Sequence, residues 1–388
     1  MSRRLLITLE PNVLRWARER SRIDLERLAK KIDVKPERVL EWEHSGRISV
    51  AQADKLAHHT HTPVGFLYLP EPPEDQLPIP DLRSRRKDVT ANPSPDLLET
   101  AYLMQRRQAW MHDELLEEGS DPLDFVGAFK DKSDHFQVAN AMRASLQLEE
   151  NWASRLPTWS DALSHLREQA DLAGLLVVFT GIVGNNTSRK LDKDEFQGFA
   201  LVDDLAPLVF VNSADYQVAQ MFTLAHEIAH LFVGESGLTG FNYHQPPDNA
   251  TEQFCDRTAA EFLVSEDELR AYWPTARNME DPYQAIARRF KVSNLVSARR
   301  ALDLDLVSLE AFLEFYEESR ATTWLRKRPT NSGGNFWNTQ RWRIGPRFGA
   351  AVARAVKDGR LLYQEAYSLT GLKRDTFEKL PEQMGVTL

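Results

Sequence analysis

The chain has 388 residues, of which 42% are hydrophobic and 27% charged, an ordinary composition for a water-soluble protein. Its net charge of −9 argues against a protein whose whole surface is basic enough to bind nucleic acid. The longest nearly apolar run, residues 172–184, has 13 residues, whereas a membrane span needs about 18 or more. We therefore expect two or three domains and no membrane association.

Two further features bear on the cellular compartment. Residues 1–11 contain a short apolar run after two arginines, but they lack the longer apolar core of a secretory signal. Cys255 is the single cysteine, so the chain cannot form an internal disulfide bond. Both features lead us to expect a cytoplasmic protein.

The first segment, residues 1–70, is expected to be a series of short helices. Pro11 and Pro36 stand where two of these helices begin. Asp24 stands as an N-cap, and Gly46 lies just past a helix end. Short helices joined by tight turns indicate a helix-turn-helix unit. The segment holds 13 Lys/Arg and 9 Asp/Glu, so it is basic although the whole chain is acidic.

This segment resembles the XRE-type, lambda-repressor-like helix-turn-helix family over LERLAKKIDVKPERVLEWEHSGRISVAQADKLAHHTHTPVGFLYLPEPP. The resemblance rests on the alanine of the second helix, the WE..G ending of the third and the closing FLYLPEPP. Lys35 and Arg38 could then contact DNA phosphates or a guanine edge, whereas the neighbouring glutamates would repel phosphates. The alternative is a module of the same shape that docks a protein or forms a homodimer. DNA therefore stays one of two candidate partners of residues 1–70.

The rest of the chain alternates between helical and strand patterns. Residues 71–95 are rich in proline and predict a linker or an extended strap. The apolar run at 172–184 and the stretch GFALVDDLAPLVFVN predict buried strands, the latter around a turn at 203–207. Beyond residue 252 the pattern is helical again. The sequence therefore predicts an α+β fold that is mostly helical and contains a small β-sheet.

The stretch FTLAHEIAH, residues 222–230, contains the pattern H-E-x-x-H. His226 and His230 are four residues apart on one helix face, so both imidazoles can bind one zinc ion at about 2.0–2.1 Å. Glu227 is adjacent and can act as the general base that takes a proton from water. The alternative is an exposed helix turn that carries the pattern by chance. Three polar side chains are candidates for stabilising an oxyanion, with packing or loop roles as the alternative: Tyr216, Tyr243 and His244.

A catalytic zinc site needs a third protein ligand and one open position. Glu252 is the preferred candidate because it begins a helix that can pack against the H-E-x-x-H helix and aim the carboxylate inward. The alternative for Glu252 is a carboxylate favoured by the dipole at an exposed helix N-terminus. Manganese or iron could also occupy a His-His-Glu site. The other downstream candidates are His244, Asp248, Asp256 and Glu261.

The sequence around this pattern resembles the ImmA/IrrE family of zinc metallopeptidases over roughly residues 170–305. The resemblance rests on GFALVDDLAPLVFVN, MFTLAHEIAHLFVG and EQFCDRTAAEFLVSEDEL. It implies that Glu252 is the third ligand of one zinc ion per chain, beside the two histidines of the motif. Asp256 stands where the family usually has Asn, a departure that could alter the surroundings of the metal ligands.

The resemblance implies a cytoplasmic zinc endopeptidase of narrow specificity. Members of that family cleave transcriptional repressors, so the expected partner is a helix-turn-helix repressor of prophage, mobile-element, toxin–antitoxin or stress control. Two alternatives stay open. One is a DNA-binding transcriptional regulator whose metal site is structural or regulatory, which a fourth protein ligand would favour. The other is a toxin whose protease activity a partner restrains, which toxicity on expression would favour.

Composition and motifs together divide the chain into five expected segments. The catalytic pattern falls in the fourth, for which the resemblance implies a zincin-like core, and a basic loop falls in the last. The segments are an XRE-like helix-turn-helix domain (1–70), a proline-rich linker (71–95), a helical connector (96–170), an ImmA/IrrE-like zinc peptidase domain (171–305) and a helical C-terminal module (306–388).

Overall fold

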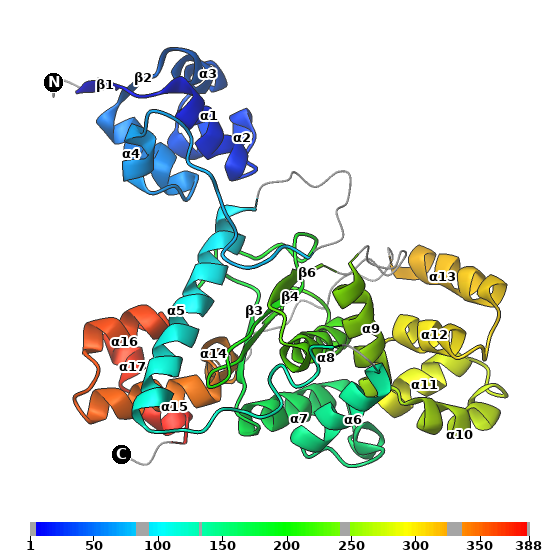
Figure 1. Cartoon of the computed structure of the whole chain (residues 1–388). Coiled ribbons are helices and arrows are strands. Elements are labelled where there is room, and N and C mark those ends of the chain that lie inside the picture. Colours follow the sequence, from blue (N-terminus) through cyan, green and yellow to red (C-terminus); the bar gives the residue numbers. More distant parts are fainter. Residues whose placement is uncertain (1–4, 83–92, 132–133, 241–248, 324–335, 386–388) are drawn as a thin grey trace. The chain divides into compact units, whose positions relative to one another are not determined.

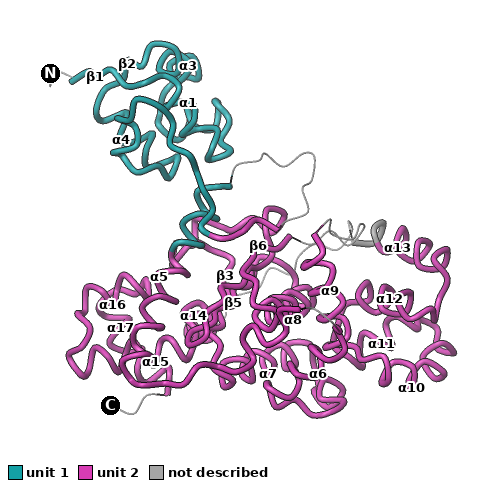
Figure 2. The backbone as a smooth tube through the Cα atoms, viewed as in Figure 1, with its two compact units in different colours: residues 1–78, 86–102 teal, residues 79–85, 103–388 magenta. Residues whose placement is uncertain are grey.

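The computed structural model describes residues 5–82, 93–131, 134–240, 249–323 and 336–385. The chain divides into two compact units, one of residues 1–78 and 86–102 and the other of residues 79–85 and 103–388 (Figure 2). Helices dominate and the strands are few and short, which confirms the expected α+β, mostly helical fold class (Figure 1). Among the described residues, no helix is both long and apolar enough to cross a membrane.

The first unit packs short helices around one core, and the expected helix signals act where the sequence places them. The Asp24 side chain accepts a hydrogen bond from the Arg27 backbone N–H at the start of its helix. Gly46 ends the third helix with φ +68°, and a Cβ there would lie 1.9 Å from the Leu9 carbonyl oxygen. The elements are β1 (Leu6–Thr8), α1 (Pro11–Arg20), α2 (Leu25–Ile32), α3 (Pro36–Ser45), β2 (Arg47–Ser49), α4 (Val50–His59) and the 3₁₀ helix η1 (Val64–Tyr68).

Two features of this unit are additional to the sequence expectations. The strands β1 and β2 form a short antiparallel pair in which Ile7 lies opposite Ile48. Glu43 is buried, and the Arg18 side chain pairs with it at 2.6 Å between Nε and Oε1. Trp42 is fully buried in the core of this unit.

Trp42→Ala is expected to destabilise the first unit by about 3–5 kcal/mol, because it deletes a fully buried aromatic side chain. The measurement is hydrogen exchange of the backbone amides of α1–α4 in the full chain, in which the opening free energy should fall by that amount. Leu40→Ala on the same helix is the control, since Leu40 is 40% exposed. Equal effects of the two substitutions would contradict the packing role.

The second unit is built on a four-stranded sheet of order β3-β5-β4-β6. The strand β3 runs parallel to β5, whereas β4 is antiparallel to both β5 and β6. The sheet contains the expected buried strands, and Figure 1 shows it beside α8. The strands are β3 (Leu176–Thr180), β4 (Gly198–Leu201), β5 (Leu208–Asn212) and β6 (Gly237–Thr239).

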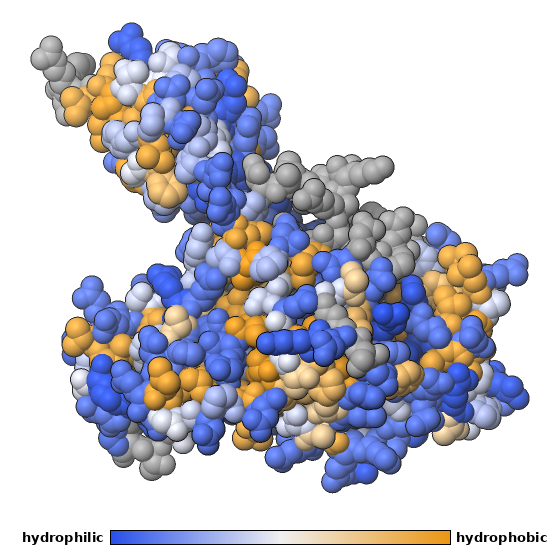
Figure 3. Space-filling view, in the orientation of Figure 1, coloured by the Kyte–Doolittle hydropathy of each residue, from blue (hydrophilic) through white to orange (hydrophobic). Residues whose placement is uncertain are grey.

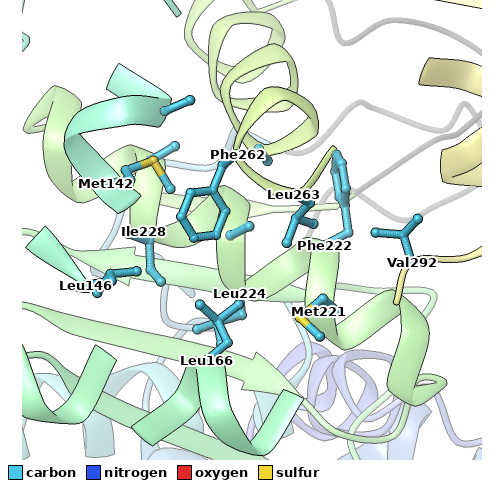
Figure 4. Packing of buried hydrophobic residues seen from close by; sticks show 14 of the residues in the cluster. Met142, Leu146, Leu166, Met221, Phe222, Leu224, Ile228, Phe262, Leu263 and Val292 are labelled. Atoms are coloured by element: carbon cyan, nitrogen blue, oxygen red, sulfur yellow. The ribbon is translucent and has the colours of Figure 1, made fainter. Parts of the chain in front are cut away.

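The two faces of the sheet are covered by different groups, because side chains alternate along each strand. On one face Phe199 stacks on Phe210, with ring centroids 4.7 Å apart. On the other face, residues such as Ala200 and Val209 join the main core, which extends to α10–α12 (residues 266–303). Figure 4 shows side chains of four further helices of this core converging. These helices are α6 (His135–Ser145), α7 (Trp159–Leu172), α8 (Gln217–Val233) and α9 (Ala250–Leu263). The helices α6 and α7, most of which fall in the expected connector 96–170, thus supply part of this core.

The remaining helices follow α9 in the chain, and α5 (Pro95–Glu117) is tied to the last of them. The Arg107 guanidinium donates to the backbone carbonyls of Leu369 and Arg343, each at 2.8 Å. On the face shown in Figure 3, polar and apolar residues are interspersed, as on most protein surfaces. The helices are α10 (Glu266–Ala276), α11 (Pro282–Phe290), α12 (Asn294–Asp303), α13 (Leu309–Thr323), α14 (Phe336–Ile344), α15 (Pro346–Lys357), α16 (Tyr363–Thr370), α17 (Arg374–Phe377) and α18 (Leu380–Gln383).

Candidate metal centre

The helix α8 carries the H-E-x-x-H pattern in the middle of the core. Every residue from Gln220 to Val233 is buried, so this helix is enclosed on all sides rather than amphipathic. Gly234 ends it in the left-handed conformation, with φ +77°, which is a common helix stop. His226, Glu227 and His230 are all 0% exposed. The alternative of an exposed helix turn therefore does not apply to this chain.

The helix α9 brings the third side chain to the same place. Its N-cap is Asn249, whose side chain accepts hydrogen bonds from the backbone N–H groups of Thr251 and Glu252. Glu252 consequently lies in the first turn, where the helix dipole favours a carboxylate. It is 2% exposed, so the alternative of an exposed carboxylate at a helix N-terminus does not describe it either.

The ligand atoms of the three side chains converge within the distances that one small cation requires. The Nε2 atoms of His226 and His230 are 3.0 Å apart. The Glu252 carboxylate lies 3.3 Å from Nε2 of His226 and 3.0 Å from Nε2 of His230. A tetrahedral ion with bonds of about 2.0–2.1 Å separates its ligands by about 3.3 Å. The two imidazoles and one carboxylate therefore fit zinc in number, chemistry and spacing.

The pKa values of these groups show strong coupling through the low-dielectric interior. Burial lowers the pKa of His226, but the carboxylates of Glu252 and Asp256 outweigh this effect and raise it to about 10. Burial raises the pKa of Glu252, but the two imidazoles outweigh it and hold it at about 2. Burial lowers the pKa of His230. Without a metal, the site thus holds an ionised carboxylate against one protonated imidazole, and metal binding would replace that proton.

A second layer of acceptors faces the outer nitrogen of each imidazole. Nδ1 of His226 lies 2.9 Å from Oδ1 of Asp256, one helical turn beyond Glu252 on α9. Nδ1 of His230 lies 3.2 Å from the Glu235 carbonyl oxygen. The Glu235 carboxylate in turn accepts a hydrogen bond of 2.7 Å from the Thr251 hydroxyl. Such partners fix which nitrogen faces the metal, so both Nε2 atoms are oriented toward the same point.

Glu227 points toward the sheet instead of joining the three ligands. A Cβ on Gly198 of β4 would lie only 2.7 Å from Oε1 of Glu227, so the carboxylate fits because this residue is glycine. Burial raises the pKa of Glu227 well above its usual range, which the charge of His226 and the Thr239 hydroxyl offset in part. A buried carboxyl with a raised pKa is a stronger base than an exposed one, as proton abstraction from water requires.

The other candidate residues lie elsewhere or outside the described residues. Tyr243 and His244 fall in residues 241–248, outside the described residues, as does Asp248. Tyr216 is the N-cap of α8 and is 48% exposed, about 15 Å along the helix from His226 at 1.5 Å per residue. Glu261, in the C-terminal half of α9, forms an ion pair with Arg300.

The candidates for DNA contact lie on α3 of the first unit. Lys35 is the exposed N-cap residue of this helix. Arg38 forms an ion pair with Glu41 on the same helix. Arg38 thus has a carboxylate partner on its own helix.

Several residues that shape the site were not assigned from the sequence. Asp256 is not among them, because the sequence already indicates it as a residue that could alter the surroundings of the ligands, and its spacing of four from Glu252 places both on one helix face. Gly198, Thr239 and Glu235 carry no comparable signal, because long-range packing alone brings them to the site. A second cluster of His112, Asp203 and Asp204 also has metal-ligand chemistry, but Asp203 there caps a turn by accepting from two backbone N–H groups.

Comparison with known proteins supports a peptidase-like domain at this place. Residues 170–302 match the family Peptidase_M78, described as an IrrE N-terminal-like domain. This range contains the four strands of the sheet together with α8 and α9. Residues 344–383 match a domain of unknown function, DUF8813. No curated protein and no solved structure matches the chain. The expected resemblance to the ImmA/IrrE family is thus supported for the domain that carries the candidate metal centre.

Asp256→Ala is expected to weaken zinc binding by about 10–100-fold, because His226 loses the acceptor that orients its ring. The measurement is the dissociation constant for zinc by chelator competition. Asp256→Asn should lose less, since the amide oxygen can still accept from Nδ1. Asp267→Ala, which removes an exposed carboxylate from the next helix, is the control for charge. Equal affinities for wild type and Asp256→Ala would show that Asp256 has no orienting role.

Gly198→Ala is expected to destabilise the second unit by about 1–3 kcal/mol. The added methyl group would lie 2.7 Å from Thr223 Cγ2 and 2.9 Å from the Phe210 carbonyl oxygen, besides its clash with Glu227. The measurement is the opening free energy of the β4 and β5 amides by hydrogen exchange. Gly65→Ala is the matched control, because nothing lies within 4 Å of the added methyl there. A neutral Gly198→Ala would contradict the close packing of Glu227 against β4.

Proposed function

We propose that this protein is a zinc-dependent endopeptidase of narrow specificity. The single observation that carries the proposal is the convergence of two imidazoles and one carboxylate within 3.0–3.3 Å of one another in a buried site. The neighbouring carboxyl of Glu227 and the match of residues 170–302 to a peptidase family support it. We extend the proposal to one zinc ion per chain, with manganese or iron as alternative occupants.

In this proposal, His226, His230 and Glu252 would hold the metal. Asp256 and the Glu235 carbonyl orient the two imidazoles, and Glu252 lies in the first turn of α9. A bound zinc ion supplies Lewis acidity, which polarises a peptide carbonyl and makes water a stronger nucleophile near neutral pH. Glu227 accepts the proton of the attacking water and returns it to the departing amine. The new carbon–oxygen bond forms first by addition of water to the carbonyl, and the carbon–nitrogen bond then breaks as the nitrogen receives the proton, so the products are a carboxylate and an amine.

The donor set favours a catalytic site over a structural one. Structural zinc sites are closed by four protein ligands, usually with cysteine among them. Within the described residues, the cluster of possible ligands at this site consists of three members, and Cys255 is not one of them. The alternative function, a DNA-binding regulator with a structural or regulatory metal, would gain support from a fourth protein ligand.

The proposed substrate is a helix-turn-helix repressor. This part of the proposal rests on the resemblance of residues 170–305 to the ImmA/IrrE family and of residues 1–70 to XRE-type domains. The first unit would then recruit the repressor or its operator, with a homodimer as a further arrangement. A cytoplasmic location, where such a repressor acts, belongs to the same proposal.

Glu227→Gln is expected to bind zinc as the wild type does and to lose cleavage by at least about 100-fold, because the amide cannot accept the proton. The measurement combines zinc content with cleavage of a panel of purified XRE-type repressors, followed by mass spectrometry of the products. Glu280→Gln, an exposed glutamate beyond α10, is the matched control and should retain full activity.

Two outcomes would contradict the proposal. If the zinc-loaded wild type cleaves neither a repressor nor an unrelated protein added for comparison, the regulator with a structural metal is favoured. Cleavage that persists in Glu227→Gln at the wild-type rate would remove Glu227 from the chemistry or reveal a contaminating protease.

A further inference from the structure

The outer edge of β6 is covered by a segment from the proline-rich stretch, residues 80–82, here called the strap. The Leu238 N–H donates to the Pro80 carbonyl oxygen at 2.9 Å. The Leu82 N–H donates to the Leu238 carbonyl oxygen at 3.2 Å. These two bonds form a parallel bridge between Asp81 and Leu238. The strap thus extends the sheet by one residue pair at its β6 edge.

Side-chain packing holds the strap in register with β6. Leu82 lies over Gly237. A Cβ added to Gly237 would lie 2.2 Å from Leu82 Cδ1, and its nearest neighbours would all be atoms of the Leu82 side chain. Gly237 therefore leaves the space that the Leu82 side chain fills. Ile79, immediately before the strap, is 5% exposed and anchors its start. Both the backbone and the side chains therefore contribute to this contact.

The edge that the strap covers belongs to the candidate metal centre. Thr239 of β6 pairs with Gly198 in the sheet, and both lie against Glu227. The carbonyl oxygen of Glu235, two residues before β6, accepts a hydrogen bond from Nδ1 of His230. Leu238 lies between these two positions. Its outward N–H and C=O are the groups that a further extended chain at this edge would have to use.

We infer that the strap occupies the sheet edge on which an extended segment of the protein substrate pairs, so that strap and substrate compete for the backbone of Leu238. An extended peptide that adds to an exposed sheet edge gains its affinity from main-chain hydrogen bonds. Because Leu238 has one N–H and one C=O, the two occupants exclude each other. The inference rests on the proposed peptidase function and adds its regulation: the protein is restrained until the strap leaves β6.

The strap can be released by a single substitution that leaves the metal centre unchanged. Leu82→Pro removes the N–H that donates to Leu238 and replaces the side chain that covers Gly237. Glu71→Pro introduces the same residue in the same linker, where it removes no backbone hydrogen bond among those formed by the described residues. It is therefore the matched control. Both variants are made in the zinc-loaded full chain.

The first measurement is independent of cleavage. Hydrogen exchange of the Leu238 amide should accelerate at least about tenfold in Leu82→Pro and stay at the wild-type rate in Glu71→Pro. In the Glu227→Gln background, a fluorescent peptide of residues 76–82 should bind the Leu82→Pro variant and not the parent, as read by fluorescence anisotropy. Unchanged Leu238 exchange, or equal peptide binding by both proteins, would overturn the inference.

The second measurement is the initial rate of repressor cleavage. Leu82→Pro should cleave several-fold faster than wild type through a lower KM, with kcat little changed, because the strap competes with substrate binding. An unchanged KM together with an exposed Leu238 amide would overturn the inference while the peptidase function stands. If neither protein cleaves any repressor but the peptide binds only Leu82→Pro, the proposed peptidase function fails and the competition at β6 stands.

Discussion

The burial of one carboxylate between two imidazoles is the interaction on which the rest of the second unit depends. A carboxylate removed from water is costly unless charge and hydrogen bonds compensate it. Glu252 is 2% exposed, and the compensation comes from His226 and His230 on the neighbouring helix. The helices α8 and α9 must therefore pack at a fixed distance and register, and the core around them enforces both. A metal ion at the same point would strengthen this constraint, because it joins all three side chains.

The sheet completes the site from the other side. Gly198 allows Glu227 to lie against β4, and β6 carries Thr239 beside the same carboxylate. The two outer partners, Asp256 and Glu235, come from α9 and from the turn that follows α8. The three candidate ligands, Glu227 and Asp256 thus lie on helices, whereas the Glu235 carbonyl comes from a short turn between α8 and β6. Groups held on helices favour a preorganised site. The strap is part of the proline-rich stretch 71–95, and it pairs with β6 at the edge of this sheet.

Much of the site could be predicted from sequence because local spacing determines it. The four-residue interval places His226 and His230 on one helix face, and Asn249 begins the helix that carries Glu252. The strand pair β1–β2, the pairing of the strap with β6 and the role of Gly198 could not be predicted. Three-residue strands have no readable periodicity, and their pairing depends on residues far apart in the sequence. The part of α6 and α7 in the core could not be predicted for the same reason, since helical spacing does not tell which core a helix joins.

The central claim is that His226, His230 and Glu252 bind one metal ion and leave a position open. X-ray absorption at the zinc edge of the zinc-loaded full chain tests it most directly. The account predicts a first shell of nitrogen and oxygen only, at about 2.0–2.1 Å, with the outer-shell scattering of two imidazoles. A sulfur scatterer at about 2.3 Å, the length of a zinc–thiolate bond, would indicate that the single cysteine, Cys255, binds the metal and would contradict it. So would a spectrum without imidazole scattering, because the two histidines would then not be ligands.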